Sequence, residues 1–327
     1  MSVTTRDIFG AAPGAQPAVE GSYGEPPRGT FRLPAATRLG AVRLQVADLA
    51  RSLPFYERVL GLHVAARGPG RAVLAALPDA GAAAVPLVEL HERAGARPAA
   101  PRGRLGLYHV AILLPDRASL GRFVAHLARL GVRAGAGDHL VSEAFYLTDP
   151  DGLGIEVYAD RPRAAWRRIG RELMMATDPV DVAALVRDAG DAPWTGMPAG
   201  TAIGHVHLHV GDLAGAGAFF GDALGFDRIV WSYPGALFLG AGGYHHHLGT
   251  NTWAGPTARP PAEDDARLLA WTIELPDRGA LDDAAASLAA AGAPAERADD
   301  GAVLTVDPWG TAVHLRPPRA AGLTAAG

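Results

Sequence analysis

The chain has 327 residues, of which 49% are hydrophobic and 20% charged, and its formal net charge is −4. This length and composition predict a soluble globular protein of two domains. The negative balance argues against nucleic-acid binding, and no stretch reaches the ~20 apolar residues of a membrane span. Because cysteine is absent, disulfides, thiolate metal ligands and cysteine nucleophiles are excluded. The N-terminus shows no signal pattern, so we expect a cytoplasmic protein.

A unit that repeats four times follows an unpatterned first segment. Residues 1–36 are rich in Gly, Pro and Ala, which predicts a flexible N-terminal arm. Each later copy has an apolar strand, an aspartate at a helix N-cap position, an amphipathic helix that ends at a glycine, and three short strands. The copies begin at Ala41, His109, His205 and Ala270, their aspartates are Asp48, Asp116, Asp212 and Asp277, and their glycines are Gly61, Gly131, Gly225 and Gly292.

The predicted fold class is therefore α+β, built from four βαβββ modules. We predict a first domain over residues 37–160, containing modules one and two, and a second over 201–318, containing modules three and four. Segment 161–200, with its Arg and Trp and then its Pro and Gly, reads as a connector. Residues 319–327 form a tail.

One segment of module two concentrates the residues that carry chemistry. The strand Leu-Gly-Ile-Glu-Val-Tyr-Ala at its end places Glu156 among apolar neighbours. An ionised side chain in such a position is costly unless it is paired or bound to a metal. Without cysteine, a metal would be held by histidine and carboxylate, which favours iron, manganese, zinc or nickel.

Four βαβββ modules resemble the vicinal oxygen chelate superfamily over residues 38–318, which implies paired modules that form cupped sheets around a divalent metal. Within that superfamily, the pattern Gly-x-His, Phe-Tyr, Asp-Pro-x-Gly and Glu is similar to the signature of the extradiol ring-cleaving dioxygenases. The segments His-His-His-Leu-Gly-Thr-Asn-Thr-Trp and Asp-Arg-Pro-Arg-Ala-Ala-Trp are similar to bacterial catechol 2,3-dioxygenases. The signature is carried here by Gly137, His139, Phe145, Tyr146, Asp149, Pro150, Gly152 and Glu156.

The resemblance implies metal ligands at the opening of the first strand and near the end of the last strand of a module. Only modules two and three carry ligand types at both ends, so we expect these two to build the metal-binding cup. Modules one and four would make a metal-free partner. The predicted ligands are His109, His205 and Glu156. The alternation of His205, His207 and His209 on one strand face leaves each of them open as the ligand, and the repeat alignment selects His205.

The same resemblance implies roles for further residues of the cup. His247, aligned with the closing position of module three, would be the acid–base residue, with His246 as the alternative. Tyr146 would hydrogen-bond the metal-bound substrate oxygen, and His139 would meet a second hydroxyl or shape the pocket mouth. Four aromatic residues would clamp a planar ring or belong to the ordinary core, namely Phe145, Tyr158, Tyr244 and Trp253.

The resemblance implies an extradiol dioxygenase of aromatic hydrocarbon catabolism, which inserts both atoms of O2 into a catechol-type diol at a mononuclear non-heme Fe(II) centre. Mn(II) offers the same coordination and stays an alternative. Two other functions are open: a glyoxalase-type lyase or isomerase with His247 as a fourth ligand around zinc or nickel, and a ligand-binding resistance protein without catalysis. The expected partners are a small aromatic diol and O2, with neither nucleic acid nor membrane. A homo-oligomer is left open.

Overall fold

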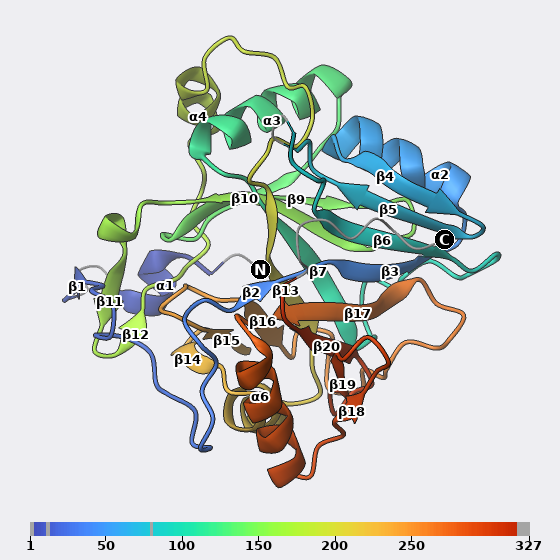
Figure 1. Cartoon of the computed structure of the whole chain (residues 1–327). Helices are drawn as coiled ribbons and strands as arrows, with labels where there is room; N and C mark the ends of the chain where they lie inside the picture. Colours follow the sequence, from blue (N-terminus) through green and yellow to red (C-terminus); the bar gives the residue numbers. More distant parts are fainter. Residues whose placement is uncertain (1–2, 11–13, 79–80, 319–327) are drawn as a thin grey trace.

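The computed structural model describes residues 3–10, 14–78 and 81–318. The predicted tail, 319–327, lies outside the described residues. Within the described part, four βαβββ modules follow one another, so the predicted α+β class is confirmed (Figure 1). None of the described helices is long and apolar enough to cross a membrane.

Each module has one helical segment between its first and second strands. Module one comprises β3 (Val42–Val46), α2 (Leu49–Pro54), η1 (Phe55–Leu60), β4 (His63–Gly68), β5 (Arg71–Ala75) and β6 (Pro86–Glu92). Module two comprises β7 (Gly106–Leu113), α3 (Arg117–Leu130), β8 (Gly135–Asp138), β9 (Ser142–Thr148) and β10 (Gly154–Asp160). Module three comprises β13 (Ala202–His209), α5 (Leu213–Ala216), η3 (Gly217–Ala223), β14 (Asp227–Val230), β15 (Ala236–Gly240) and β16 (Leu248–Asn251). Module four comprises β17 (Arg267–Glu274), α6 (Arg278–Ala290), β18 (Glu296–Arg297), β19 (Val303–Val306) and β20 (Ala312–Arg316).

The four predicted N-cap aspartates begin these helices. Each accepts a hydrogen bond from a backbone N–H of the first turn, which satisfies one of the unpaired donors there. The four predicted glycines all have positive φ, between 67° and 95°, as a helix-ending residue often does. In modules one and three the second half of the helix is a π-helix, which the repeat pattern did not predict.

The modules pair in two large sheets. One sheet has the order β14-β15-β16-β13-β7-β10-β9-β8 and joins modules two and three through the antiparallel pair β7 and β13. The other has the order β18-β19-β20-β17-β3-β6-β5-β4, with β2 (Arg38–Leu39) added to β17, and joins modules four and one. Modules two and three therefore share one sheet, as predicted. Each sheet thus combines one module from residues 37–160 with one module from residues 201–318. The predicted domain boundaries stay a prediction.

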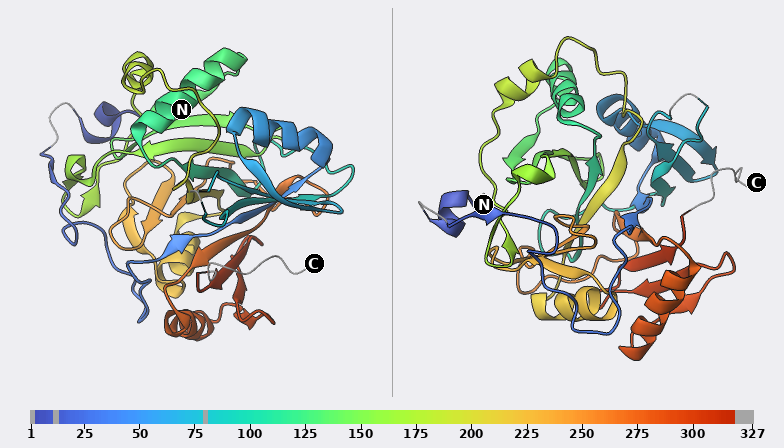
Figure 2. Two further views of the ribbon diagram at one scale, coloured as in Figure 1. Left: turned by 45° about the horizontal axis from the view of Figure 1, so that its top comes forward. Right: turned by 60° about the vertical axis from the view of Figure 1, so that its left-hand side comes forward.

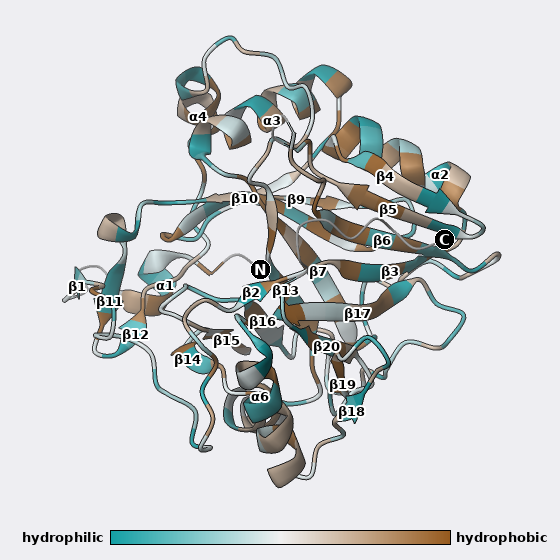
Figure 3. Ribbon diagram, in the orientation of Figure 1, coloured by the Kyte–Doolittle hydropathy of each residue, from teal (hydrophilic) through white to brown (hydrophobic). Residues whose placement is uncertain are grey.

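The helices of the four modules lie on the outer faces of the two large sheets (Figure 2). Apolar residues gather on the strands and on the helix faces turned toward them, whereas the outer helix faces and many loops are hydrophilic (Figure 3). One cluster of buried apolar residues contains members of all four modules, among them Val42, Ile112, Phe220 and Trp271. A continuous core thus fixes the two sheets relative to each other.

The first segment and the connector have structure of their own. A small sheet pairs β1 (Gln16–Pro17) with β11 (Arg167–Ile169) and β11 with β12 (Glu172–Leu173). The first segment also contains α1 (Thr5–Phe9). Farther along this segment, Tyr23 and Leu33 are buried. The connector adds η2 (Arg163–Ala165) and α4 (Val182–Asp188). These contacts tie the first segment to the rest of the chain, and the flexibility of the arm stays a prediction.

The Asp-Pro-Asp-Gly turn before β10 is built around one buried carboxylate. Asp149 accepts hydrogen bonds from the N–H groups of Asp151 at 2.9 Å and Leu153 at 2.8 Å, and from the Tyr56 hydroxyl at 3.1 Å. Asp307 accepts the two corresponding backbone bonds in the matching turn of module four. The shared Asp-Pro pattern therefore fixes the entry angle of the closing strand in both modules.

We expect Asp149→Ala to lower the free energy of unfolding by about 3 kcal/mol, because three buried donors lose their acceptor at roughly 1 kcal/mol each. Asp277→Ala, which removes one exposed N-cap bond, is the matched control and should cost about 1 kcal/mol. Urea unfolding of both variants measures the difference. Equal losses in the two variants would contradict this reading of the turn.

Candidate metal centre

Three neighbouring strands bring the predicted ligands together at the centre of their sheet. His109 lies on β7, and β7 is flanked by β10, which carries Glu156, and β13, which carries His205. The register places both Glu156 and His205 beside Ala111. Since side chains two residues apart on a strand share a face, His109 points to the same side as Ala111. The observed register of these three strands therefore gathers the side chains of positions 109, 156 and 205 on one face of the sheet.

A bulge in β13 turns His205 toward this site. The pairing of β13 with β7 shifts between Ile203 and His205, which leaves Gly204 as the extra residue. A side chain at Gly204 would meet the Tyr158 hydroxyl at 1.8 Å, so only glycine fits. Bulges re-aim side chains in this way, and without the shift His205 would face the opposite side of the sheet.

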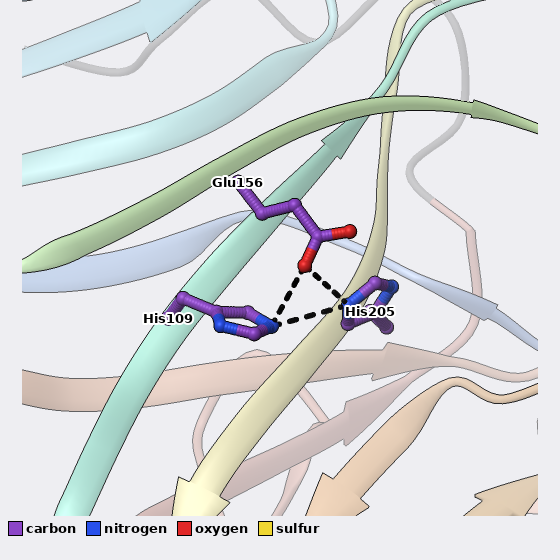
Figure 4. A group of neighbouring side chains, drawn as sticks. All are labelled: His109, Glu156 and His205. Atoms are coloured by element: carbon purple, nitrogen blue, oxygen red, sulfur yellow. Dashed lines mark hydrogen bonds and ion pairs between the residues drawn. The ribbon is translucent and has the colours of Figure 1, made fainter. Parts of the chain in front are cut away.

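The three side chains converge through one atom each (Figure 4). The Nε2 atom of His109 lies 3.0 Å from Glu156 Oε2, and the Nε2 atom of His205 lies 3.4 Å from it. The two Nε2 atoms are 3.4 Å apart. His109, Glu156 and His205 are 5%, 1% and 2% exposed, so this is a desolvated cluster.

The electrostatics of the cluster suit a cation. Burial lowers the pKa of His205 to about 4, so its imidazole is neutral at pH 7 and offers a lone pair. Burial on its own would raise the pKa of Glu156, but contacts with His205 and His109 hold that pKa well below its usual range. Glu156 is thus a buried carboxylate, and its Oε1 has no hydrogen-bond partner among the described residues. A negative charge in such a place needs a positive partner.

The donor set and its spacing fit a first-row transition metal. Ligand bonds of about 2.0–2.2 Å put two ligand atoms about 3.0 Å apart at a right angle and about 3.4 Å apart at a tetrahedral angle. The three observed separations, 3.0, 3.4 and 3.4 Å, fall in this range. Two imidazoles and one carboxylate are the donor set of non-heme Fe(II) sites. One feature departs from common metal sites, since His205 Nδ1 has no partner among the described residues.

The neighbouring histidines of β13 are engaged elsewhere. Asn251 Oδ1 accepts from the Trp253 N–H and from His209 Nδ1, so the Asn251 amide group donates to His207 Nε2 at 3.0 Å. His207 and His209 thus share one asparagine, whereas His205 faces Glu156. Of the three histidines that the sequence left open, the geometry brings only His205 into the cluster with Glu156.

The strand register corrects the predicted placement of His247. In module two, Glu156 lies opposite Ala111, two residues beyond the opening histidine. The corresponding pair in module three is His207 and Gly249. The closing position of module three is therefore Gly249. The repeat alignment placed this position at His247, two residues too early, whereas β16 begins at Leu248, directly after the three histidines.

His246, rather than His247, lines the cavity beside the cluster. Its ring centroid lies 4.1 Å from that of His205. The Nδ1 atom of His247 accepts a hydrogen bond from the Ala241 N–H at 3.2 Å, and burial lowers its pKa to about 3.

A chain of hydrogen bonds sets the tautomer of His246. Asp160 Oδ1 accepts from His245 Nε2 at 2.8 Å, and the two Nδ1 atoms of His245 and His246 are 2.7 Å apart. A neutral His245 that donates at Nε2 accepts at Nδ1, so His246 donates there. The lone pair of His246 is then left on Nε2.

His139 and Tyr146 form a second polar pair in the wall of the same cavity. His139 Nδ1 donates to the Ala176 carbonyl at 2.7 Å, so its Nε2 accepts from the Tyr146 hydroxyl. This bond leaves the lone pairs of the Tyr146 oxygen free to accept from a bound molecule. The connector contributes directly to the site here, since it supplies Ala176.

The cavity has a volume of about 350 Å³. Of the four aromatic residues that the sequence proposed as ring clamps, Trp253 lines it. Phe145 lies in the apolar core, and Tyr158 and Tyr244 hydrogen-bond each other outside the lining. The sequence analysis missed the lining residues Tyr108, Tyr233, Phe238 and Met175. Only Tyr108 carried a sequence signal, because it adjoins His109.

Comparisons with known proteins agree with this architecture. The profile of the Glyoxalase/Bleomycin resistance protein/Dioxygenase superfamily matches residues 38–157. The chain is 48% identical over 250 residues to a catechol-2,3-dioxygenase of Bacillus subtilis (strain 168), covering 75% of this chain and 85% of that protein.

Two solved structures share the fold. A putative dioxygenase from Bacillus subtilis matches with a TM-score of 0.60 at 12% identity, over 89% of this chain and 87% of that one. Glyoxalase I from Zea mays matches with a TM-score of 0.51 at 18% identity, over 86% and 92%. The predicted vicinal oxygen chelate fold is thereby confirmed. Together with the 48% identity, these matches show that the chain belongs to the glyoxalase/bleomycin resistance protein/dioxygenase superfamily, as an enzyme related to catechol-2,3-dioxygenase.

Proposed function

We propose that the protein is an extradiol dioxygenase that cleaves a catechol-type diol with O2 at a mononuclear Fe(II) centre. The observation that carries this proposal is the buried set of two imidazoles and one carboxylate, which opens onto a cavity of about 350 Å³. Such a facial set leaves metal positions free for substrate and dioxygen. The catechol-2,3-dioxygenase relative supports the same reaction class.

The ligands we propose are His109, His205 and Glu156. An Fe(II) ion held by them would lower the pKa of a diol hydroxyl and supply the redox-active centre for dioxygen. Mn(II) is accepted by the same donor set. The neutral imidazole of His205 and the unpartnered oxygen of Glu156 favour binding of either ion.

Two sets of side chains handle protons and orientation in this proposal. Tyr146, whose proton is held by His139, accepts a hydrogen bond from a substrate hydroxyl. His246 holds a proton-accepting Nε2 next to the ligand set, so we assign the acid–base role to His246 in place of His247. The chain of hydrogen bonds from Asp160 through His245 to His246 keeps the Nε2 atom of His246 free.

The alternative functions fit the geometry less well. A four-ligand lyase needs a fourth donor at the closing position of module three, and that residue is Gly249. His247, the expected fourth ligand, is bonded to the backbone at Ala241. A binding protein without catalysis would have no need of a buried carboxylate between two imidazoles.

We expect anaerobically Fe(II)-loaded protein to consume about one O2 per catechol and to form a yellow ring-opened product. His109→Ala should abolish the reaction, because two remaining protein ligands no longer make a facial set. His126→Ala, a change of a histidine outside the centre, is the control and should retain activity. Oxygen uptake and absorbance measure both. Protein that holds iron at this site and consumes no O2 with any diol would refute the proposed reaction.

We expect His246→Ala to lower kcat by about 10²–10⁴-fold, the range of a general acid–base residue. His247→Ala should lower kcat less than tenfold, on the order of a packing change. Steady-state kinetics of the two neighbouring variants, with iron content measured in each, separates these roles. A larger loss in the His247 variant would reverse our assignment.

A further inference from the structure

A second cavity adjoins the cavity beside the metal centre. Its volume is about 490 Å³, and Tyr108, His109 and Tyr146 line both cavities. A third, smaller cavity of about 150 Å³ adjoins the second one, and both are lined by Arg267, the first residue of β17. The three cavities therefore form a row that leads from the candidate metal centre to the start of β17.

The wall of the second cavity carries one cation more than it needs to balance its own anion. Two arginines and one aspartate line it, namely Arg104, Arg267 and Asp265. Asp265 Oδ2 lies 3.3 Å from Arg104, and Asp265 Oδ1 lies 2.8 Å from Arg97, which is outside the lining. The carboxylate of the wall is thus already paired with two guanidinium groups, and the charge of Arg267 is left over.

The guanidinium of Arg267 is half-buried and unpartnered. Its Nε atom is shielded from solvent and has no hydrogen-bond partner among the described residues, and no ion pair there includes this arginine. A buried donor without a partner is costly, and more so when it is charged. Since a guanidinium matches the geometry of a carboxylate, a carboxylate ligand would remove this cost.

The backbone around Arg267 is held in place. β17 pairs Arg267 with Gln45 of β3. The Gln45 amide group donates to the carbonyls of Glu263 at 2.6 Å and Asp265 at 2.8 Å, so it fixes the loop that leads into β17. A pre-organised site loses less entropy when a ligand binds.

Ring opening creates a negative charge that an unsubstituted diol lacks. Extradiol cleavage breaks the ring bond between a hydroxylated carbon and its neighbour, and each of the two carbons gains one oxygen atom. The hydroxylated carbon becomes a carboxyl group and its neighbour an aldehyde. O2 takes up four electrons from the diol, and no other reactant is consumed. At neutral pH the carboxyl group releases its proton to solvent, so the product is an anion.

We propose that the second cavity is a product site, in which Arg267 binds the carboxylate that ring opening forms. This inference rests on the proposed function and assigns a ligand to a cavity outside the metal centre. The uncharged diol makes no ion pair with Arg267, whereas the anionic product makes a charge-assisted hydrogen bond. Arg267 thus distinguishes the product from the substrate by charge.

The test is calorimetric titration of the Fe(II)-loaded protein under argon with cis,cis-muconate, a stable open-chain dicarboxylate that has the six carbons of ring-opened catechol. We expect Arg267→Gln to bind muconate at least about tenfold more weakly than the wild type, because the charge is lost. Arg267→Lys keeps the charge and should recover part of the affinity. Arg259→Gln removes the same charge from an exposed arginine outside the lining and should bind as the wild type does.

Equal muconate affinity in the wild type and Arg267→Gln, or no binding by the wild type, would overturn the product site. Oxygen uptake with catechol in the same preparations would then leave the proposed reaction standing. An equally large loss in Arg259→Gln would trace the effect to overall charge and would also overturn the site. If muconate binding depends on Arg267 in protein that holds iron and consumes no O2 with any diol, the proposed reaction falls, and with it the product as the ligand.

Catechol itself is the second titrant, because it separates charge recognition from a general change of the cavities. It has no carboxylate, so its affinity should change less than about twofold in Arg267→Gln. A loss of catechol affinity as large as that of muconate would contradict recognition of the product by its charge.

Discussion

A carboxylate buried at the centre of a sheet is the constraint on which the site depends. Glu156 is 1% exposed, and its ion-pair contacts within the described part of the chain are with the imidazoles of His109 and His205. The cost of burying that charge is offset when a cation binds the same three side chains. The arrangement requires strands β7, β10 and β13 to be neighbours, so the pairing of modules two and three creates the centre. The bulge at Gly204 then completes it.

The second sheet meets the same constraint in a different way. Glu89 lies opposite Arg43, in the register that Glu156 has with Ala111. Its carboxylate accepts from Arg43 at 3.1 Å and from Arg71 at 2.9 Å. A guanidinium thus neutralises the glutamate of one sheet, whereas in the other sheet the small side chain of Ala111 leaves room between the histidines. The fourfold repeat has diverged at the position that decides whether this glutamate pairs with arginine or lies between two histidines.

The parts of the site predictable from the sequence follow from strand periodicity. The module repeat aligned His109 with His205, and the apolar run around Glu156 indicated a buried strand. The role of His247 was harder to predict because three consecutive histidines precede β16. Which of the three reaches the cavity depends on the conformation of the preceding loop, where Gly242 and Gly243 have positive φ. The contact of His139 with Ala176 joins segments 37 residues apart. The packing of the connector, which no local pattern encodes, fixes that contact.

The central claim is that His109, His205 and Glu156 bind one metal ion. The most direct test is anomalous diffraction at the iron edge from crystals of protein loaded with Fe(II) without air. We expect a single strong peak at about 2.0–2.2 Å from the Nε2 atoms of both histidines and from a Glu156 oxygen. Full iron loading with the peak at other residues, or a peak that excludes Glu156, would contradict the claim.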